Sequence, residues 1–358
     1  MMNYEKRYDN LRKYMAEAGL DGIYINSPEN FYYMSGYSNP DGYMLITRSS
    51  AYAFSDFRYI EAAREKTTDL CKVCLIGEEF LVSYIEKENI KTLGIEDCAI
   101  TVAEHERLLS DLPNFCKTVP VGTYFTELRA VKESFEVDQI KAAQRIAETA
   151  FDKLLNAIRP NMTEIEVASE LEYYMKKGGS DKPSFDTIAV SGKASSVPHG
   201  TPRNVPLERG FLTLDFGATV GGYCSDMTRT VVIGHADDDM RNLYNTVLTA
   251  QTAAIEAITC GADCGEMDRI ARDIINGAGY EGKFGHSLGH GVGIMIHELP
   301  VQSPRAFGKK LEAGNIVTVE PGIYIEGMYG CRIEDMMYIT ESGAVNLTDC
   351  TKELIEIV

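Results

Sequence analysis

The sequence predicts a two-domain protein, with an α/β amino-terminal domain followed by an α+β domain. The chain has 358 residues, which is more than one compact core usually holds. In its first third, short apolar segments alternate with amphipathic helices, as in an α/β sheet domain. Beyond residue 178, strands and glycine-rich turns predominate. We therefore expect domains at 1–128 and 129–358.

The first domain should begin with a helix over 3–18, because Leu11, Tyr14 and Met15 fall on one face and Gly19 follows. Short apolar runs then indicate strands at GIYIN, YMLIT, CKVCLI and KTLGIE. Further helices are expected at 56–66, between the last two of these strands, and at 101–111. Such alternation predicts a largely central sheet.

The second domain should begin with two helices. Apolar residues recur at helical spacing before Pro160, which closes the first helix. Thr163 and Glu166 form the capping-box pattern that starts the second. Two more helices are expected near 237–259 and 264–277.

The charge of the chain excludes some classes of partner. Lys and Arg number 35 against 53 Asp and Glu, a formal net charge of −18, and no basic stripe indicates a nucleic-acid or anionic-membrane surface. No apolar run approaches the length of a membrane-spanning helix, and the charged start lacks the apolar segment of an export signal, so we expect a cytoplasmic protein. Nine scattered cysteines are then expected as reduced thiols. The CxxC pair Cys71 and Cys74 has no second pair beside it, which favours a buried strand over a zinc or redox site.

Two predicted β-hairpins carry paired carboxylates. A hairpin around a Val-Gly-Gly turn is predicted for FLTLDFGATVGGYCSDMTRTVVI, and Asp215 and Asp226 should face each other across it. A second hairpin is predicted for IVTVEPGIYIEGMYGCRIEDMMYIT, with Glu320 and Glu334 symmetric about Gly327. Facing carboxylates repel unless a proton or a cation lies between them. Two such pairs favour a four-carboxylate cluster over the alternative, in which the acids point to solvent from exposed sheet faces.

Histidines gather between these hairpins. The segment FGHSLGHGVGIMIHELP holds His286, His290 and His297, three of the six histidines of the chain. A lone histidine is usually structural, but three among glycines that allow close backbone approach indicate a site. The segment is neither an HExxH zinc helix nor a dinucleotide-binding loop. Carboxylates with an imidazole favour manganese, iron or cobalt, and two such ions about 3–4 Å apart can hold a bridging hydroxide that attacks a polarised carbonyl.

These segments resemble the metallopeptidase family with the pita-bread fold, which includes aminopeptidase P, prolidase and methionine aminopeptidase. The resemblance is carried by VPHG at 197–200, LDFGA at 214–218, SDMTRT at 225–230, GHGVG at 289–293, IHELP at 296–300, VEPGIY at 319–324 and RIED at 332–335. YINSPENFYYMSGY is more weakly similar to the creatinase-type amino-terminal domain. The resemblance implies a creatinase-like domain over 1–128 and a pita-bread catalytic domain over 129–358.

The resemblance also implies roles for individual residues. The implied ligands of two metal ions are Asp215, Asp226, His290, Glu320 and Glu334, of which Asp226 and Glu334 bridge. Glu320 is further implied in moving the proton of the attacking water. The implied carbonyl- and oxyanion-binding residues are His199 and His297. The implied substrate-side residues are His286, in the pocket for proline, and Arg332, which would orient ligands or substrate.

The implied substrates are peptides with proline in second position, and the implied assembly is a homodimer. Methionine aminopeptidase is disfavoured because it generally lacks the amino-terminal domain. Some prolidases hold the carboxylate of a dipeptide with an arginine four residues after the IHE histidine. Here that position is Val301, and Arg305 is out of register. We therefore expect an Xaa-Pro aminopeptidase with two divalent ions, Mn²⁺ first and Co²⁺, Fe²⁺ or Zn²⁺ as alternatives; the alternative activity is that of an Xaa-Pro dipeptidase, or prolidase.

Two other classes of protein share this fold. A creatinase-like enzyme works without metals, but that interpretation leaves the five implied ligands without a purpose. A non-catalytic binding protein would have lost its ligands, whereas this chain carries all five and both carbonyl-binding histidines. Both alternatives are therefore disfavoured.

Overall fold

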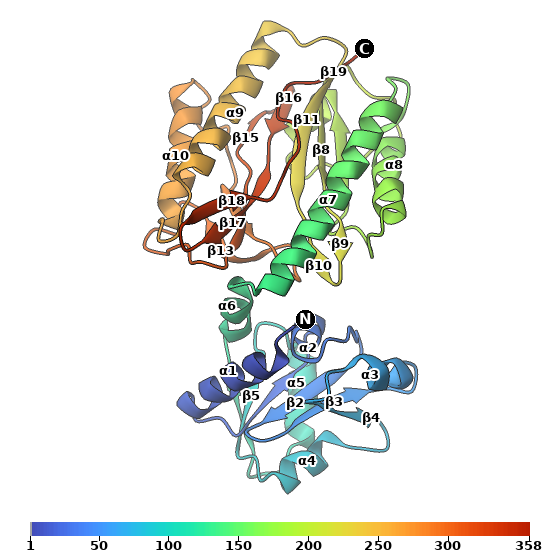
Figure 1. The fold of residues 1–358 in the computed structure, drawn as a ribbon, viewed down its shortest axis with the longest axis vertical. Helices are drawn as coiled ribbons and strands as arrows, with labels where there is room; N and C mark the ends of the chain where they lie inside the picture. The colour runs from blue at the N-terminus through green and yellow to red at the C-terminus, as the bar shows by residue number, and fades with distance from the viewer. Residues whose placement is uncertain (1) are drawn as a thin grey trace. The chain divides into compact units, whose positions relative to one another are not determined.

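The computed structural model describes residues 2–358. They form two compact units, which comprise residues up to 127 and residues 128–358 (Figure 1).

Unit 1 is an α/β domain around a six-stranded mixed sheet of order β4-β3-β2-β1-β5-β6. Its strands are β1 (Gly22–Ile25), β2 (Tyr43–Thr47), β3 (Ala51–Ser55), β4 (Lys72–Leu75), β5 (Thr92–Ile95) and β6 (Lys117–Pro120). Its helices are α1 (Tyr4–Glu17), α2 (Pro28–Ser35), α3 (Ile60–Lys66), α4 (Leu81–Lys87) and α5 (Val102–Asp111), and α6 (Tyr124–Ala130) leads into unit 2. Strands β1, β5 and β6 run parallel, whereas β2 is antiparallel to both of its neighbours.

Most of the expected elements of unit 1 are present, and four others were not expected. Strands β3 and β6 and helices α2 and α6 were missed, although Ser27 at the N-cap and Pro28 at the first helical position are start signals for α2. Helix α3 begins at Ile60, later than expected. Cys74 lies buried in β4, as expected for a structural strand.

Unit 2 is an α+β domain with two larger sheets. One has the order β19-β11-β8-β7 and the other the order β13-β12-β14-β17-β18, and two short hairpins complete the set. Its strands are β7 (Ile188–Ser191), β8 (Gly210–Phe216), β9 (Thr219–Val220), β10 (Tyr223–Cys224), β11 (Met227–Ile233), β12 (Gly289–Gly291), β13 (Glu298–Gln302), β14 (Ile316–Val319), β15 (Gly322–Ile325), β16 (Tyr329–Arg332), β17 (Asp335–Thr340), β18 (Gly343–Asn346) and β19 (Glu356–Ile357). Its helices are α7 (Ser134–Ala157), α8 (Glu164–Lys177), the 3-10 helix η1 (Gly192–Ser196), α9 (Asp238–Ala257) and α10 (Cys264–Gly277).

The helices of unit 2 cover the strands from two sides (Figure 1). Helices α7 and α8 pack apolar residues such as Ala147 and Leu171 against Leu214 of β8. Helices α9 and α10 form a second core with β14 and β17, in which Val247 packs near Val317. The strands that carry the predicted site therefore lie between two apolar layers, which hold their backbones in place.

The register of the two long hairpins decides how the acidic residues meet. The pairs Val319 with Asp335 and Gly322 with Arg332 place Glu320 opposite Glu334, which confirms the predicted symmetry of that hairpin.

The prediction that Asp215 and Asp226 face each other directly is wrong, because Asp215 lies opposite Thr228. The turn is the cause. Its central residues are Gly221 and Gly222, with φ of 53° and 78°, as a two-residue turn with positive φ at both positions requires. The centre of the hairpin thus lies between Gly221 and Gly222 instead of between residues 220 and 221, and Asp226 lies two positions away from the partner of Asp215.

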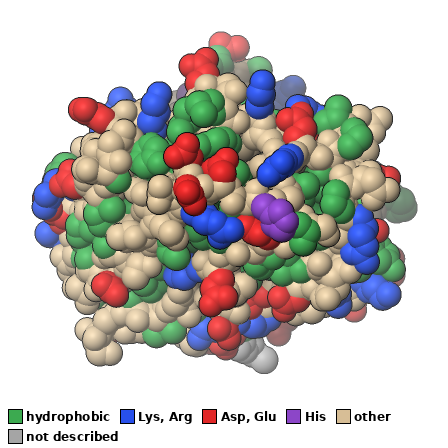
Figure 2. All heavy atoms as spheres, turned by 90° about the horizontal axis from the view of Figure 1, so that it is seen from above, with side chains coloured by type: hydrophobic (Ala, Val, Ile, Leu, Met, Phe, Trp, Pro, Cys, Tyr) green, Lys and Arg blue, Asp and Glu red, His purple; other side chains and the backbone are tan. Residues whose placement is uncertain are grey.

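Acidic and basic side chains are interspersed on the face shown in Figure 2, where no extended basic stripe is visible. Among residues 2–358, no helix is both long and apolar enough to cross a membrane.

Candidate metal centre

Five predicted ligands converge from separate strands of unit 2, and we call them the acidic cluster: Asp215, Asp226, His290, Glu320 and Glu334. Asp215 lies in β8 and Asp226 directly precedes β11. His290 is the middle residue of β12. Glu320 follows β14, and Glu334 lies between β16 and β17.

Distances within the cluster suit a shared cation. One ligand atom from each of Asp226, His290 and Glu334 lies within 4.8 Å of the others. The Nε2 atom of His290 is 3.6 Å from Oδ2 of Asp226 and 3.3 Å from Oε1 of Glu320. Asp215 joins through Arg332, whose Nη2 donates to Asp215 Oδ2 at 2.5 Å.

Two buried carboxylate oxygens have no hydrogen-bond donor among the described residues, Asp215 Oδ1 and Glu334 Oε1. The other oxygen of each is satisfied, by Arg332 and by the Thr228 hydroxyl at 2.7 Å. Leaving a buried acceptor without a partner is costly, and a cation satisfies such an acceptor. Together with the oxygen-rich donor set, these orphaned atoms show that the residues fit divalent metal ions.

The electrostatics of the cluster favour a bound cation. Burial, followed by the charges of neighbouring carboxylates, raises the pKa of Asp226 and of Glu334 well above their usual values. Burial also raises the pKa of Asp215. Glu320 differs: burial raises its pKa, but the hydrogen bond and charge of His290, together with the charges of His286 and Arg332, outweigh burial and lower it to about 2. A cation would stabilise the other carboxylates in the ionised form without a proton.

The orientation of His290 is fixed by its backbone surroundings. Its Nδ1 donates to the Gly291 carbonyl at 3.0 Å, so Nε2 is the nitrogen that faces the carboxylates and that would offer its lone pair to a metal ion in the neutral ring. Its backbone N–H donates to the Thr318 hydroxyl, which in turn donates to Glu320 Oε1 at 3.0 Å. Gly289 allows β12 to lie this close to β14, because a Cβ at Gly289 would be 2.1 Å from the Thr318 carbonyl oxygen.

Arg332 is the centre of a hydrogen-bond network that the sequence did not reveal. Its Nη1 donates to the Tyr324 hydroxyl at 2.7 Å and to the Pro198 carbonyl at 3.3 Å. Its Nε donates to Thr228, the residue that also bonds Glu334. Thr228 and Tyr324 were missed as site residues, although both lie in the motifs SDMTRT and VEPGIY.

His286 lies at the other end of this network. Its Nε2 is 3.0 Å from the Tyr324 hydroxyl, and its Nδ1 is 2.9 Å from the Ser287 carbonyl. Burial lowers the pKa of His286, which favours the neutral imidazole. With Nδ1 donating and Nε2 accepting, both ring nitrogens are engaged, which leaves the ring face for any ligand.

His199 and His297 are both exposed. The rings of His297 and His290 meet edge to face with centroids 4.4 Å apart. Burial and the neighbouring His290 lower the pKa of His297, and His199 adds to this effect. His199 likewise contributes to lowering the pKa of His286, so the structure brings these histidines into one neighbourhood beside the cluster.

Comparison with known proteins decides the family. Residues 138–341 match metallopeptidase family M24, and residues 7–131 match the creatinase/prolidase N-terminal domain. The chain belongs to metallopeptidase family M24. Membership implies a hydrolase that uses divalent metal ions, in agreement with the donor set, and it confirms the predicted fold class of a creatinase-type domain followed by a pita-bread domain.

Relatives within the M24 family match along the whole chain. A protein of Pyrococcus furiosus named Xaa-Pro dipeptidase is 38% identical over 355 residues, which cover 98% of this chain and 100% of the relative. Among solved structures, an Xaa-Pro dipeptidase from Bacillus anthracis has a TM-score of 0.94 at 37% identity, covering 99% of this chain and 100% of its own. An X-Pro aminopeptidase from Thermotoga maritima has a TM-score of 0.89 at 33% identity, covering 98% and 100%.

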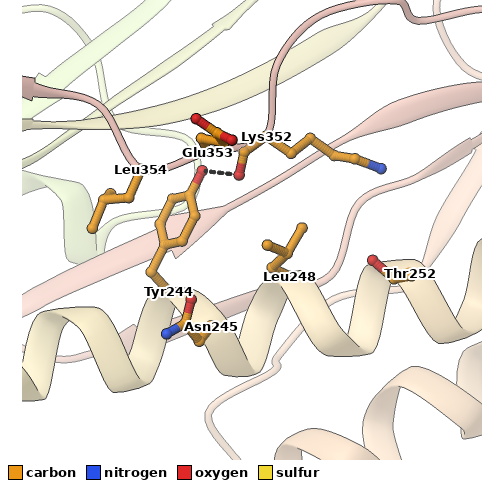
Figure 3. A pocket seen from close by; sticks show the side chains of 7 residues that line it. All are labelled: Tyr244, Asn245, Leu248, Thr252, Lys352, Glu353 and Leu354. Carbon is orange, nitrogen blue, oxygen red and sulfur yellow. Dashed lines mark hydrogen bonds between the residues drawn. The ribbon is translucent and has the colours of Figure 1, made fainter.

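A pocket elsewhere on this M24 unit contains none of the cluster residues. It lies between α9 and the carboxyl-terminal segment (Figure 3). Its lining residues are Tyr244, Asn245, Leu248, Thr252, Lys352, Glu353 and Leu354. The Tyr244 hydroxyl donates to the Lys352 carbonyl at 3.1 Å, which ties the helix to that segment. We assign this pocket no part in the chemistry of the cluster.

Proposed function

We propose that this M24 metallopeptidase is an Xaa-Pro dipeptidase that hydrolyses the bond before proline. The observation that carries hydrolysis is the buried cluster with two orphaned carboxylate oxygens. Similarity over the full chain to proteins named Xaa-Pro dipeptidase supports the choice of substrate.

This choice reverses the order of the two activities expected from the sequence, where the aminopeptidase came first. That expectation rested on Val301, a single side chain of β13 that is 37% exposed. One missing arginine is a weaker argument than similarity that extends over 98% of the chain. An Xaa-Pro aminopeptidase remains the second candidate, because a solved structure of that name is also similar along the chain.

The proposed metal ligands are the five residues of the acidic cluster, with Mn²⁺ as the proposed ion. Divalent ions there would supply Lewis-acid polarisation of the scissile carbonyl and activation of the water nucleophile. Asp226 and Glu334 are proposed to be shared between two ions, because burial and repulsion by neighbouring carboxylates raise the pKa of both well above the usual value.

The protein residues would supply positioning and proton transfer. Glu320 is proposed to accept the proton of the attacking water, since it is ionised and held by Thr318 and His290. His199 and His297 are proposed to donate to the carbonyl oxygen as negative charge develops on it. His286 is proposed to offer its ring face to proline. Arg332 is proposed to act on the substrate side by holding Asp215 and Tyr324 in place.

The proposal is tested with a peptide panel in which the second residue is varied, run after chelation and reloading with manganese, cobalt and zinc in turn. We expect cleavage only when proline is second and only after a metal is restored. Equal cleavage of Xaa-Ala peptides would contradict it. A homodimer and a cytoplasmic location, both expected from the sequence, stay predictions.

A further inference from the structure

We propose that Arg129 and Lys132 are positioning residues for His297, acting through the buried carboxylate of Glu298. The inference rests on the proposed function, in which His297 donates to the scissile carbonyl. It concerns residues outside the acidic cluster that no part of the proposed chemistry has used.

The three side chains form a buried ion triad. Arg129 Nε lies 3.0 Å from Glu298 Oε1, and Lys132 Nζ lies 2.9 Å from Oε2. The side chains of Arg129, Lys132 and Glu298 are only 3%, 1% and 1% exposed. Although burial alone would raise it, Lys132 and Arg129 hold the pKa of Glu298 below its usual value. Breaking such a set leaves an uncompensated buried charge, so the geometry is tightly held.

Glu298 controls the segment that presents His297. It follows His297 directly, begins β13 and pairs with Gly291 of β12, the strand that carries His290. Its Oε1 also accepts from the Met295 N–H at 3.2 Å. On its other side Gly293 packs closely, since a Cβ there would lie 2.3 Å from Oε2. The carboxylate is therefore enclosed by the turn between β12 and β13, and an exposed His297 takes its direction from that turn.

The two cations come from a different part of the sequence. Arg129 belongs to the last turn of α6, and Lys132 lies just before α7. The Lys132 N–H also donates to the Gly314 carbonyl at 2.8 Å, which anchors this short stretch independently of the triad. Residues at the start of unit 2 thus provide two anchored positive charges that hold Glu298, and with it the segment that carries His297. Apolar residues of similar volume would often stabilise as well as a buried ion set, so a positional role accounts better for the charges.

The test is a double-mutant cycle on the full chain. Glu298→Gln and Lys132→Met are each made alone and together with His297→Ala. We expect each single change to lower kcat about tenfold or more with KM and metal content nearly unchanged, and to cost less than about twofold when His297 is already absent. Lys132→Arg should restore most of the loss. If each triad variant lowers kcat by the same factor whether or not His297 is present, the proposal is overturned.

A second readout does not depend on turnover. In full-length protein with ¹³C-labelled histidine, the His297 ring signal is assigned by its absence in His297→Ala. It should shift in Glu298→Gln and Lys132→Met. It should stay in place in Glu148→Gln, which removes another buried carboxylate of unit 2 that pairs with Arg145. An unmoved signal in a folded triad variant would overturn the proposal.

If Glu298→Gln does not fold, Lys132→Met decides, because it leaves the Arg129–Glu298 pair intact. Absence of Xaa-Pro cleavage by the wild type would refute the proposed function, while the NMR result would still decide the positioning role.

Discussion

Individual residues of the acidic cluster use one polar atom for a protein partner and turn another toward the cluster. Asp215 and Glu334 each give one oxygen to a protein donor and keep the other buried without one. His290 likewise uses Nδ1 for a carbonyl and directs Nε2 at carboxylates. Short motifs in the sequence were sufficient to name the five residues that the structure brings together in the acidic cluster. They could not reveal Thr228 and Tyr324, because the partner of a hydroxyl is set by tertiary contacts.

Replacing Asp226 by Asn should abolish most hydrolysis, by at least about a hundredfold, and lower the metal content. The same change removes a buried charge that its neighbours repel, so the chelated variant should unfold at the same temperature as chelated wild type or a higher one. Metal analysis, kinetics and thermal unfolding check these outcomes together. Near-normal turnover at saturating metal would show that Asp226 is not a ligand.

His297→Ala should behave differently, because His297 is proposed to bind the carbonyl rather than a metal. We expect full metal content with kcat lowered about a hundredfold, the scale for loss of one oxyanion donor. Metal analysis beside steady-state kinetics measures both quantities. Loss of metal in this variant would instead place His297 among the ligands.

At the scale of secondary-structure elements, the positions of the ligands depend on register and on close approach of strands. The glutamate hairpin followed the symmetry of its sequence, whereas the aspartate hairpin did not. The apolar residues of the aspartate hairpin correctly predicted its two strands, but a turn centred on Gly221 and Gly222 shifted which residues pair. Hydrophobic alternation predicts that two strands pair, while the conformation of the turn sets which residues lie opposite each other.

Gly289→Ala tests the approach of β12 to β14. The added methyl group would overlap the Thr318 carbonyl, so β12 must shift and carry His290 with it. We expect the free energy of unfolding to fall by about 1–3 kcal/mol, and metal affinity to fall as well. Urea unfolding and metal titration measure these effects. Gly285→Ala is the control, because no heavy atom lies within 4 Å of a Cβ at that position. Equal behaviour of the two variants would contradict the packing argument.

At the scale of the whole molecule, most helices and the two-part organisation were predictable from periodicity and capping signals. Strands β3 and β6 were not, because short segments carry little pattern of their own and are specified by neighbours in the sheet. The choice between substrates was also beyond the sequence, since it had rested on Val301 alone.

The pH dependence of stability follows from the raised pKa values of Asp226 and Glu334. When a carboxylate has a higher pKa folded than unfolded, the folded state binds more protons, and stability falls as pH rises above the usual carboxylate range. Chelated protein should therefore lose stability as the pH rises above about 5, whereas metal-loaded protein should not. The lowered pKa of Glu320 changes stability in the opposite direction, but only below its ordinary pKa of 4.5, beneath this pH range. Thermal unfolding across this range measures the difference, and parallel curves would contradict it.

The central claim is most directly tested by the ratio of kcat/KM for an Xaa-Pro dipeptide to kcat/KM for the same peptide extended by one residue, measured with manganese-loaded protein. We predict a ratio well above one, with both activities abolished by chelation. A clear preference for the longer peptide would contradict the claim and make the protein an Xaa-Pro aminopeptidase.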